Sequence, residues 1–425
     1  MTRKILALII TLAFVLSACG GKTGTTGGGL VTITFSAWGA PEELAVWNQI
    51  VADFEAANTN IKVNVEVSDW DAYWDKLKTQ LAANTPPDIF AMDAPLFLDY
   101  QSRGVLLNLQ PYIDQNPDML KDVYPQTLLA YQTPDGYYGL PRDFQTIVLF
   151  YNKDMFDAAG MAYPTADWTW EDLRTAAKQL TKDTSGDGKI DQYGFFFDQW
   201  DMEPGWSEAI WAYGGDIVNA DHTKTLIGDP AARQSWQLLY DMVFVDKSVP
   251  DANTIGQYGG DLFQAKVAAM TPMGHWAVPG YNTGGFKYDV VPMPKGPAGQ
   301  ATSVNSAGFV VAKATKHPQE AFNFIKFVLS QSGQTRLAEL GFACPVLKTV
   351  AESPTFLQQS SSTLNQQVFL TSLAFAHMKP VFKGYDEWAS VVGDGMGAVW
   401  RGEADLNTTL NDIVTQADAV LAKNK

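Results

Sequence analysis

Residues 30 to 92 alternate between segments with strand and helix patterns. Residues 31–35 and 61–67 alternate in side-chain type with the period of two expected for a strand, and residues 88–92 form a short apolar run. Between these segments, residues 41–54 and 70–83 are predicted to be helices, the first with apolar residues at helical spacing. Strands that alternate with helices predict an α/β fold with a doubly wound, mainly parallel sheet.

Aromatic and acidic residues follow the three predicted strands. Trp38 comes after the first strand, Asp69 and Trp70 after the second, and Asp93 after the third. Ligands of open α/β sheets bind outside the carboxyl ends of the strands, where these four side chains would meet. In the structural alternative, the tryptophans cover the core and the aspartates cap the following helices. The shared position at one edge of the sheet favours a binding site.

The rest of the chain contains two segments typical of domain junctions. A chain of 425 residues is long enough for two or three domains. Residues 138–142, which include Gly and Pro, lead into a strand-like run at residues 147–151, and residues 303–312 form a second junction followed by a strand. Further helices are predicted at residues 168–182, 206–213, 230–245, 318–330 and 405–422.

Composition narrows the class of ligand. The chain has 46 acidic and 30 basic residues and a net charge of −16, which repels phosphate backbones, so we expect no nucleic-acid partner. The ligand is instead predicted to be neutral or cationic. The chain has 13 tryptophans, more than we expect the packing of the core alone to require, so some of them need another explanation.

The amino terminus has the pattern of an export signal. A basic start and an apolar run up to Leu16 predict a cleaved signal peptide over residues 1–18. The sequence Leu-Ser-Ala-Cys that ends at Cys19 resembles a bacterial lipobox, which predicts lipidation of Cys19. Residues 19–29, mostly Gly and Thr, would then be a flexible tether. The alternative is an ordinary signal peptide with a chance cysteine. Lipidation leaves Cys344 unpaired, as a small packing residue.

Six further motifs follow the lipobox and tether in order: Ile33–Trp38, Pro87–Ala91, Gly139–Pro141, Leu149–Phe156, Asp187–Phe195 and Ala269–Trp276. Together they resemble the extracellular solute-binding proteins of carbohydrate ABC importers, the maltose-binding-protein-like family. The resemblance covers nearly the whole mature chain. It implies a two-lobed periplasmic-binding-protein fold of type II, α/β in each lobe, with a ligand cleft between lobes joined by hinge segments.

The resemblance also implies a division of the chain. Residues 30–141 and 306–365 would form lobe 1, and residues 142–305 and 366–425 would form lobe 2. The two junctions predicted above fall where the chain would cross between them.

A sugar ligand requires flat aromatic platforms and polar partners for its hydroxyls. Trp276 is the strongest platform, because the Trp of its Gly-His-Trp motif matches a stacking position in the family. The other predicted ligand-binding residues are Trp38, Asp69, Trp70, Asp93, Arg142, Asp143, Gln145, Trp200, Trp211 and Tyr385, and Trp206 is a further candidate platform. Core positions are predicted for Trp47, Trp168, Trp170, Trp236 and Trp400, and Glu43 is assigned to the first turn of its helix.

The function implied by the resemblance is binding of a sugar or oligosaccharide outside the cytoplasmic membrane and its delivery, through hinge closure, to the transmembrane permease subunits of an ABC importer. We expect a monomer without a cofactor, anchored through lipidated Cys19 at the outer face of the membrane or in the periplasm. One alternative is a sensor that passes its sugar signal to a receptor. Another is a secreted glycoside hydrolase that uses two of Asp69, Asp93 and Asp143 as its acid/base pair.

Residues 183–191 resemble half of an EF-hand loop. Asp183, Ser185, Asp187 and Asp191 supply oxygen-bearing side chains at the appropriate spacing. However, Gly194 stands where the bidentate Glu belongs. We therefore favour a turn rich in Asp and Gly over a calcium site, and we expect no other metal, because the four histidines are isolated in sequence.

Overall fold

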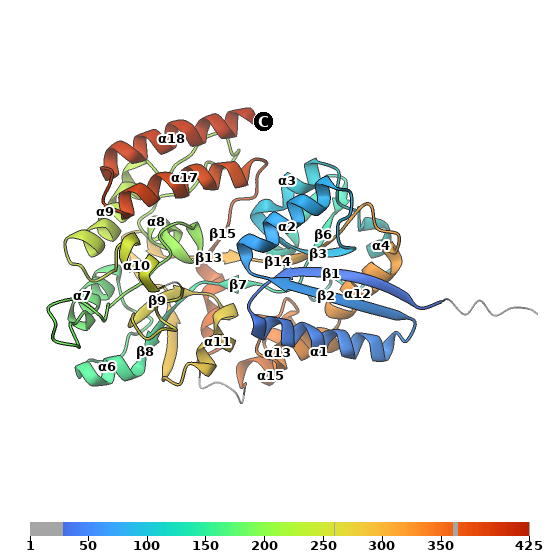
Figure 1. The fold of residues 1–425 in the computed structure, drawn as a ribbon, viewed down its shortest axis with the longest axis horizontal. Helices are drawn as coiled ribbons and strands as arrows, with labels where there is room; N and C mark the ends of the chain where they lie inside the picture. The colour runs from blue at the N-terminus through green and yellow to red at the C-terminus, as the bar shows by residue number, and fades with distance from the viewer. Residues whose placement is uncertain (1–28, 259, 360–363, 425) are drawn as a thin grey trace, which may run out of the picture.

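The computed structural model describes residues 29–258, 260–359 and 364–424, which form two α/β lobes side by side (Figure 1). Each lobe has its own sheet covered by helices, and chain segments pass between the lobes at the centre of the molecule. The two-lobed α/β fold expected from the sequence is therefore confirmed. The predicted signal peptide, Cys19 and nearly all of the tether lie outside the described residues.

Lobe 1 contains a five-stranded sheet in the order β2-β1-β3-β14-β6. Its strands are β1 (Val31–Trp38), β2 (Ile61–Ser68), β3 (Ile89–Asp93), β6 (Gly139–Pro141) and β14 (Ala307–Val311). The first three strands are parallel, as predicted, but β14 is antiparallel to both of its neighbours. The reason is the direction of entry: Ala307 pairs with Asp93, so the chain enters β14 at the edge where β3 ends.

Helices cover both faces of this sheet. The largest are α1 (Pro41–Ala57), α2 (Trp70–Ala82), α12 (Pro318–Val328) and α13 (Gln331–Glu339). Helix α1 begins with Pro41 followed by two acidic residues, a favourable first turn, and it buries Trp47 and Phe54 against Phe309 and Phe324. The smaller elements are η1 (Ala94–Leu96), α3 (Phe97–Ser102), α4 (Gln110–Asp114), α5 (Pro125–Leu129), β4 (Gln132–Thr133), β5 (Gly136–Tyr137), α14 (Lys348–Ala351) and α15 (Pro354–Leu357).

Lobe 2 contains a three-stranded sheet in the order β10-β8-β9, from β8 (Val148–Asn152), β9 (Met270–Met273) and β10 (Tyr288–Pro292). Strand β8 is antiparallel to both neighbours, so this sheet differs from the mainly parallel one predicted from residues 30–92. Val148, the first residue of β8, pairs with Met273, the last of β9, because β8 leaves the centre of the molecule and β9 returns to it.

The helices of lobe 2 include the predicted ones, at bounds close to those expected. They are α6 (Lys153–Ala159), α7 (Trp170–Leu180), α8 (Ser207–Ala212), α9 (Pro230–Phe244), α10 (Ala252–Tyr258), α11 (Val278–Thr283), α16 (Gln367–Thr371), α17 (Tyr385–Trp400) and α18 (Leu406–Lys423). Short elements complete the lobe: η2 (Met202–Trp206), η3 (His275–Ala277), η4 (Ser372–Phe375), β11 (Lys295–Gly296) and β12 (Gly299–Gln300).

A small sheet in the order β15-β13-β7 lies between the lobes (Figure 1). It consists of β7 (Gln145–Thr146), β13 (Thr302–Asn305) and β15 (Ala376–Met378). The chain switches from the sheet of lobe 1 to this small sheet between β6 and β7, and switches back between β13 and β14. The Ser306 hydroxyl donates to the Asp143 carbonyl at 2.8 Å, which joins the two crossing segments.

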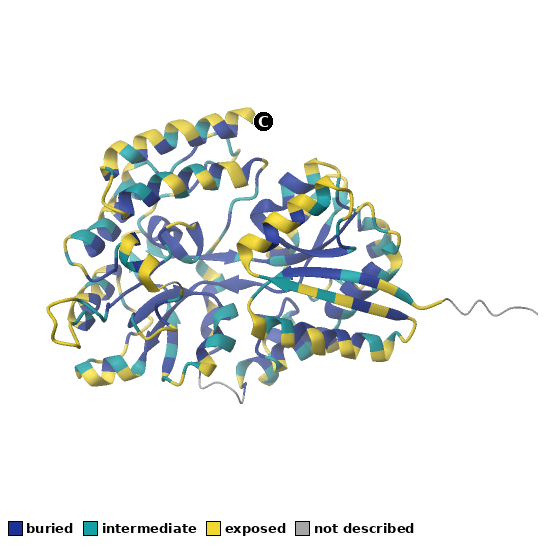
Figure 2. Ribbon diagram, viewed as in Figure 1, coloured by how far each residue is buried: buried dark blue, intermediate teal, exposed yellow. Residues whose placement is uncertain are grey.

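The strands of both lobes are largely buried, whereas the outer helices expose one face (Figure 2). Trp47, Trp170, Trp236 and Trp400 are fully buried, as predicted. Trp168 is only half-buried. Trp206, a candidate platform, is instead a core residue, since its ring packs on Trp236 with centroids 4.9 Å apart. None of the helices in the described ranges has the length and apolar character needed to cross a bilayer.

Candidate functional site

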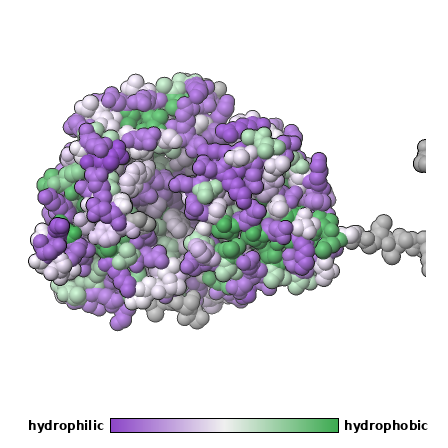
Figure 3. Space-filling model, viewed as in Figure 1, coloured by the Kyte–Doolittle hydropathy of each residue, from purple (hydrophilic) through white to green (hydrophobic). Residues whose placement is uncertain are grey.

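Two connected cavities lie between the lobes. We call the smaller one, of about 420 Å³, the inner cavity; it reaches the crossing segments at Asp143 and Asn305. The larger one, of about 820 Å³, is the outer cavity and lies between α2 and α17. Both are lined by Trp70, Asp93 and Lys379, so they form one continuous cleft. Figure 3 shows a hollow between the two lobes, bordered largely by hydrophilic residues.

Most of the predicted binding residues line this cleft. The inner cavity is lined by Trp38, Trp70, Asp93, Arg142, Asp143, Gln145 and Trp276, and the outer cavity by Trp70, Asp93, Trp200 and Tyr385. Their elements come from both lobes and from the crossing segments between them. The structure therefore brings together side chains that are far apart in the sequence.

Two predicted residues lie elsewhere. Asp69 is exposed at the start of α2, where its carboxylate accepts a hydrogen bond from the Ala72 amide at 3.0 Å, so it caps the helix. Trp211 lines a third cavity, of about 410 Å³, where its ring stacks on His377 and its indole N–H donates to Asp216. Asp69 thus has the capping contact of the structural alternative, and neither Asp69 nor Trp211 is among the residues that line the two cavities of the cleft.

The lobe 1 wall of the cleft is a cluster of aromatic rings. Trp38 ends β1 and Trp70 begins α2, so the register of the sheet brings their rings to 5.0 Å, edge to face. Trp38 also stacks on Trp74, which is nearly buried behind it. Trp70 remains 42% exposed and lines both cavities. A cluster of this kind offers a rigid apolar face to a ligand.

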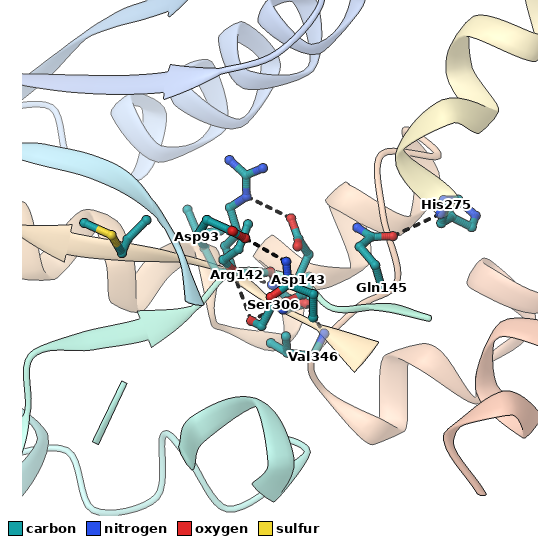
Figure 4. Close-up of polar contacts among 12 residues, drawn as sticks. Asp93, Arg142, Asp143, Gln145, His275, Ser306 and Val346 are labelled. Carbon is teal, nitrogen blue, oxygen red and sulfur yellow. Dashed lines mark hydrogen bonds and ion pairs between the residues drawn. The ribbon is translucent and has the colours of Figure 1, made fainter. Parts of the chain in front are cut away.

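Arg142 and Asp143 form a buried ion pair where the chain crosses between the lobes (Figure 4). The Arg142 Nε donates to the Asp143 carboxylate at 2.8 Å, and the guanidinium lies over the rings of Trp38 and Phe342. Burial raises the pKa of Asp143, and the Arg142 charge opposes that shift. Nη1 of Arg142 and Oδ1 of Asp143 have no hydrogen-bond partner among the described residues. Such buried groups are costly unless a ligand or water satisfies them.

Trp276 comes from the lobe 2 side, in the short helix after β9. Its ring lies so close to Gly274 that any side chain at residue 274 would collide with it, which explains the glycine of the motif. The neighbouring His275 is buried, and its backbone amide donates to the Gln145 side chain (Figure 4). Its ring Nε2 lies 2.8 Å from Oε1 of Gln366. Burial lowers the pKa of His275 to about 4, so this imidazole is neutral and structural.

A lysine missed by the sequence reading connects the two walls. Lys379 is 6% exposed, and its Nζ lies 3.5 Å from Oε2 of Glu203 and 3.9 Å from Oδ2 of Asp93. Asp93 also accepts from the Asn305 amide at 2.7 Å (Figure 4). Burial raises the pKa of Glu203 to about 8 and also raises that of Asp93, while the Lys379 charge opposes both shifts.

The sequence analysis did not identify several other cleft residues. Asp198 and Asp201 precede η2, Glu203 lies in it, and all three line the cleft from one short segment of lobe 2. Glu43 accepts from the Ala40 amide, as a residue of the first helical turn does, but it also lines the inner cavity. A cluster of Asp residues around Trp200 is the signal that could have identified this segment.

The candidate calcium loop is a turn held by its own carboxylates. Asp183 accepts from the amides of Gly186 and Gly188, and Asp191 accepts from the amide and hydroxyl of Thr184. Within the described ranges, no group of three or more His, Cys, Asp or Glu residues is arranged to hold a metal ion.

A cleft between two α/β lobes, lined by indoles and by unpaired buried polar atoms, defines the class of solute-binding proteins. The bacterial extracellular solute-binding protein family matches residues 49–361, and the chain belongs to this family. An ABC substrate-binding protein of Listeria monocytogenes, solved in complex with cycloalternan, is 27% identical with a TM-score of 0.85, over 92% of this chain and 99% of that chain.

Two relatives extend the comparison along nearly the whole chain. The galactooligosaccharide-binding protein of Bacillus subtilis is 23% identical, over 97% of this chain and 96% of its own. An uncharacterized lipoprotein of Streptomyces antibioticus is 26% identical, over 92% of this chain and 86% of its own.

Proposed function

We propose that this protein binds a sugar or oligosaccharide in the cleft and delivers it to the permease of an ABC importer. One observation carries the proposal: exposed indole faces and unpaired buried polar atoms line the same cleft. Sugar rings have apolar C–H faces that stack on indoles, and their hydroxyls both donate and accept hydrogen bonds. The galactooligosaccharide in the name of the Bacillus subtilis relative and the cycloalternan bound to the Listeria monocytogenes protein support the ligand class.

The ligand-binding residues that we propose come from three parts of the molecule. Lobe 1 supplies the Trp38–Trp70 face and Asp93, the crossing segment supplies Arg142, Asp143 and Gln145, and lobe 2 supplies Trp200, Trp276 and Tyr385. A sugar that touches both lobes stabilises the closed arrangement, and that differential contact is what drives closure. We propose the division given above, with residues 30–141 and 306–365 in lobe 1 and residues 142–305 and 366–425 in lobe 2.

We propose that the protein performs no chemistry on its ligand. Asp93 and Asp143 line one cavity, as the hydrolase alternative requires, so the alternative needs an experimental test. Some members of an oligosaccharide panel should raise the melting temperature of the purified protein. Every oligosaccharide should remain intact after incubation with it. Saturation with a bound sugar should also reduce the radius of gyration. Turnover of any glycoside would favour the hydrolase instead.

We further propose that the mature protein is anchored through lipidated Cys19 outside the cytoplasmic membrane and acts there as a monomer. The lipobox-like sequence and the lipoprotein from Streptomyces antibioticus support the anchor. In Cys19→Ala cells, the protein should leave the membrane fraction. Unchanged membrane association would contradict the anchor without affecting the sugar assignment.

A further inference from the structure

Carboxyl groups outnumber basic groups in the lining of the inner cavity. Its lining includes six carboxyl groups, those of Glu43, Asp93, Asp143, Asp198, Asp201 and Glu203, and only two basic groups, Arg142 and Lys379. The basic groups already have partners: Arg142 pairs with Asp143, and Lys379 lies between Glu203 and Asp93. Neither cation is therefore free to compensate an additional negative charge on a ligand.

Buried polar atoms without hydrogen-bond partners also indicate which ligand groups the inner cavity can bind. Asp143 is 2% exposed and Glu203 is 6% exposed, yet Oδ1 of Asp143 and Oε2 of Glu203 accept no hydrogen bond from the described residues. The Lys379 ammonium, 3.5 Å from Glu203, is an ion-pair contact without a hydrogen bond. Among the fully buried polar atoms of the cavity in the described structure, two carboxyl oxygens and one donor, Nη1 of Arg142, therefore lack a hydrogen-bond partner.

An ammonium group would supply both a positive charge and hydrogen-bond donors for the buried carboxyl oxygens. It offers three donors and no acceptor, and it adds a positive charge to a lining in which six carboxyl groups face two basic groups. A sugar hydroxyl can donate to the same oxygens but brings no charge, and hydrogen bonds between charged groups are the stronger ones. A uronate or a sugar phosphate would add a further anion to the six carboxyl groups.

We propose that the inner cavity binds an amino sugar, a saccharide with a free ammonium group, in preference to the corresponding neutral sugar. The ammonium is held by the carboxylates of Asp143 and Glu203, while the ring lies against the indoles of the cleft. This inference rests on the proposed saccharide-binding function and adds the class of saccharide.

The test uses matched sugars that differ in one group. Binding of glucosamine oligosaccharides of two to four units, of their N-acetylated forms and of the corresponding glucose oligosaccharides is measured by calorimetry at pH 6, with the galactosamine series alongside. The amino form should bind about 5- to 15-fold tighter than its neutral counterparts. This preference should fall in 0.5 M salt, and uronates should not bind.

Two isosteric variants locate the preference. Asp143→Asn removes a carboxylate and Glu203→Gln removes a carboxyl group that the bound ammonium would ionise, both with little change of volume, so each should reduce the ratio of amino to neutral affinity by at least about threefold. Asp216→Asn removes a charge from the cavity of Trp211, outside the cleft, and should keep the parent's ratio. Melting curves of all three variants check that they are folded.

Proton linkage provides an independent readout. Lys379, Glu208, Asp93 and Asp201 face Glu203, and burial holds its pKa at about 8. An ammonium ligand should drive ionisation of this carboxyl, so binding of the amino sugar should release protons and its measured enthalpy should vary with the buffer. Neutral sugars should release none.

Equal or tighter binding of the neutral forms would overturn the amino-sugar inference and leave the proposed function intact. A preference for the amino form that persists unchanged in both isosteric variants would overturn the assignment to Asp143 and Glu203. Failure of every sugar to bind would overturn the saccharide-binding function itself, and the inference with it.

Discussion

The inner cavity and the cavity of Trp211 are alike in size, at about 420 and 410 Å³, and each is lined by an indole. They differ in whether their buried polar atoms already have hydrogen-bond partners. Trp211 already makes the two kinds of contact that a ligand could provide: His377 stacks on its ring, and Asp216 accepts a hydrogen bond from its indole N–H. In the inner cavity, by contrast, Arg142, Asp143 and Glu203 keep unpaired buried atoms within the described structure. Unsatisfied polar atoms, rather than volume, therefore distinguish the inner cavity from that of Trp211.

The largest effect is expected at Arg142. Arg142→Met leaves the Asp143 carboxylate buried without its cation, so the free energy of unfolding should fall by about 3–5 kcal/mol. The variant also loses the unpaired Nη1, and sugar affinity should fall about 10- to 150-fold. Urea unfolding and calorimetry measure the two effects. In Arg174→Met, which breaks a pair with Asp246 outside the cleft, stability should fall while affinity stays unchanged. Parent-like affinity in Arg142→Met would contradict its role in binding.

Trp276 should come next. Trp276→Ala removes an aromatic platform from the lobe 2 wall, and a contribution of about 1–3 kcal/mol corresponds to a 5- to 150-fold loss of sugar affinity. Trp47→Phe, a change in the buried core of lobe 1, is the control and should reduce stability but leave affinity nearly unchanged. Calorimetry on both variants measures the dissociation constant for the sugar. An unchanged dissociation constant in Trp276→Ala would show that this residue does not contribute to binding.

The inner cavity should also make stability depend on pH. The pKa of Glu203 is about 8 in the folded protein, against an ordinary value of 4.5, so its contribution to stability is fully present below about pH 4.5 and is lost as pH rises to 8. The loss is about 1.4 kcal/mol for each unit of the shift. Glu203→Gln should therefore flatten the fall in unfolding free energy between pH 5 and 8, as urea titrations measure. The exposed control Glu403→Gln should retain the parent's slope. Identical slopes for Glu203→Gln and the parent would refute the assignment.

The smallest effect is expected in the cavity of Trp211. His377→Ala removes the ring stacked on Trp211, which should cost about 0.5–1.5 kcal/mol of stability. Sugar affinity should stay within about twofold of the parent, because the stacked pair lies outside the cleft. Calorimetric measurement of sugar affinity in His377→Ala and Trp276→Ala under the same conditions compares the two cavities directly. A loss of affinity as large as that of Trp276→Ala would mean that this cavity also takes part in binding.

The sequence alone determined the local elements and the class of fold. Strand alternation and helical stripes are properties of neighbouring residues, so β1, α1, β2 and α18 could be predicted from the pattern to within a few residues. The ends of β1 and β3 could also be predicted as one edge of the sheet, which brought Trp38 and Asp93 to the cleft.

Only the tertiary structure decided which side chains meet there. Lys379 follows β15, a strand of the small sheet between the lobes, and has no local signal, yet it contacts Asp93 of lobe 1 and Glu203 of lobe 2. Trp211 and Trp276 have similar glycine-rich surroundings in sequence, but one ring is covered by His377 and the other lines the cleft. The physical reason is that burial, pairing and pKa depend on groups brought together from distant parts of the chain, whereas secondary structure depends mainly on near neighbours.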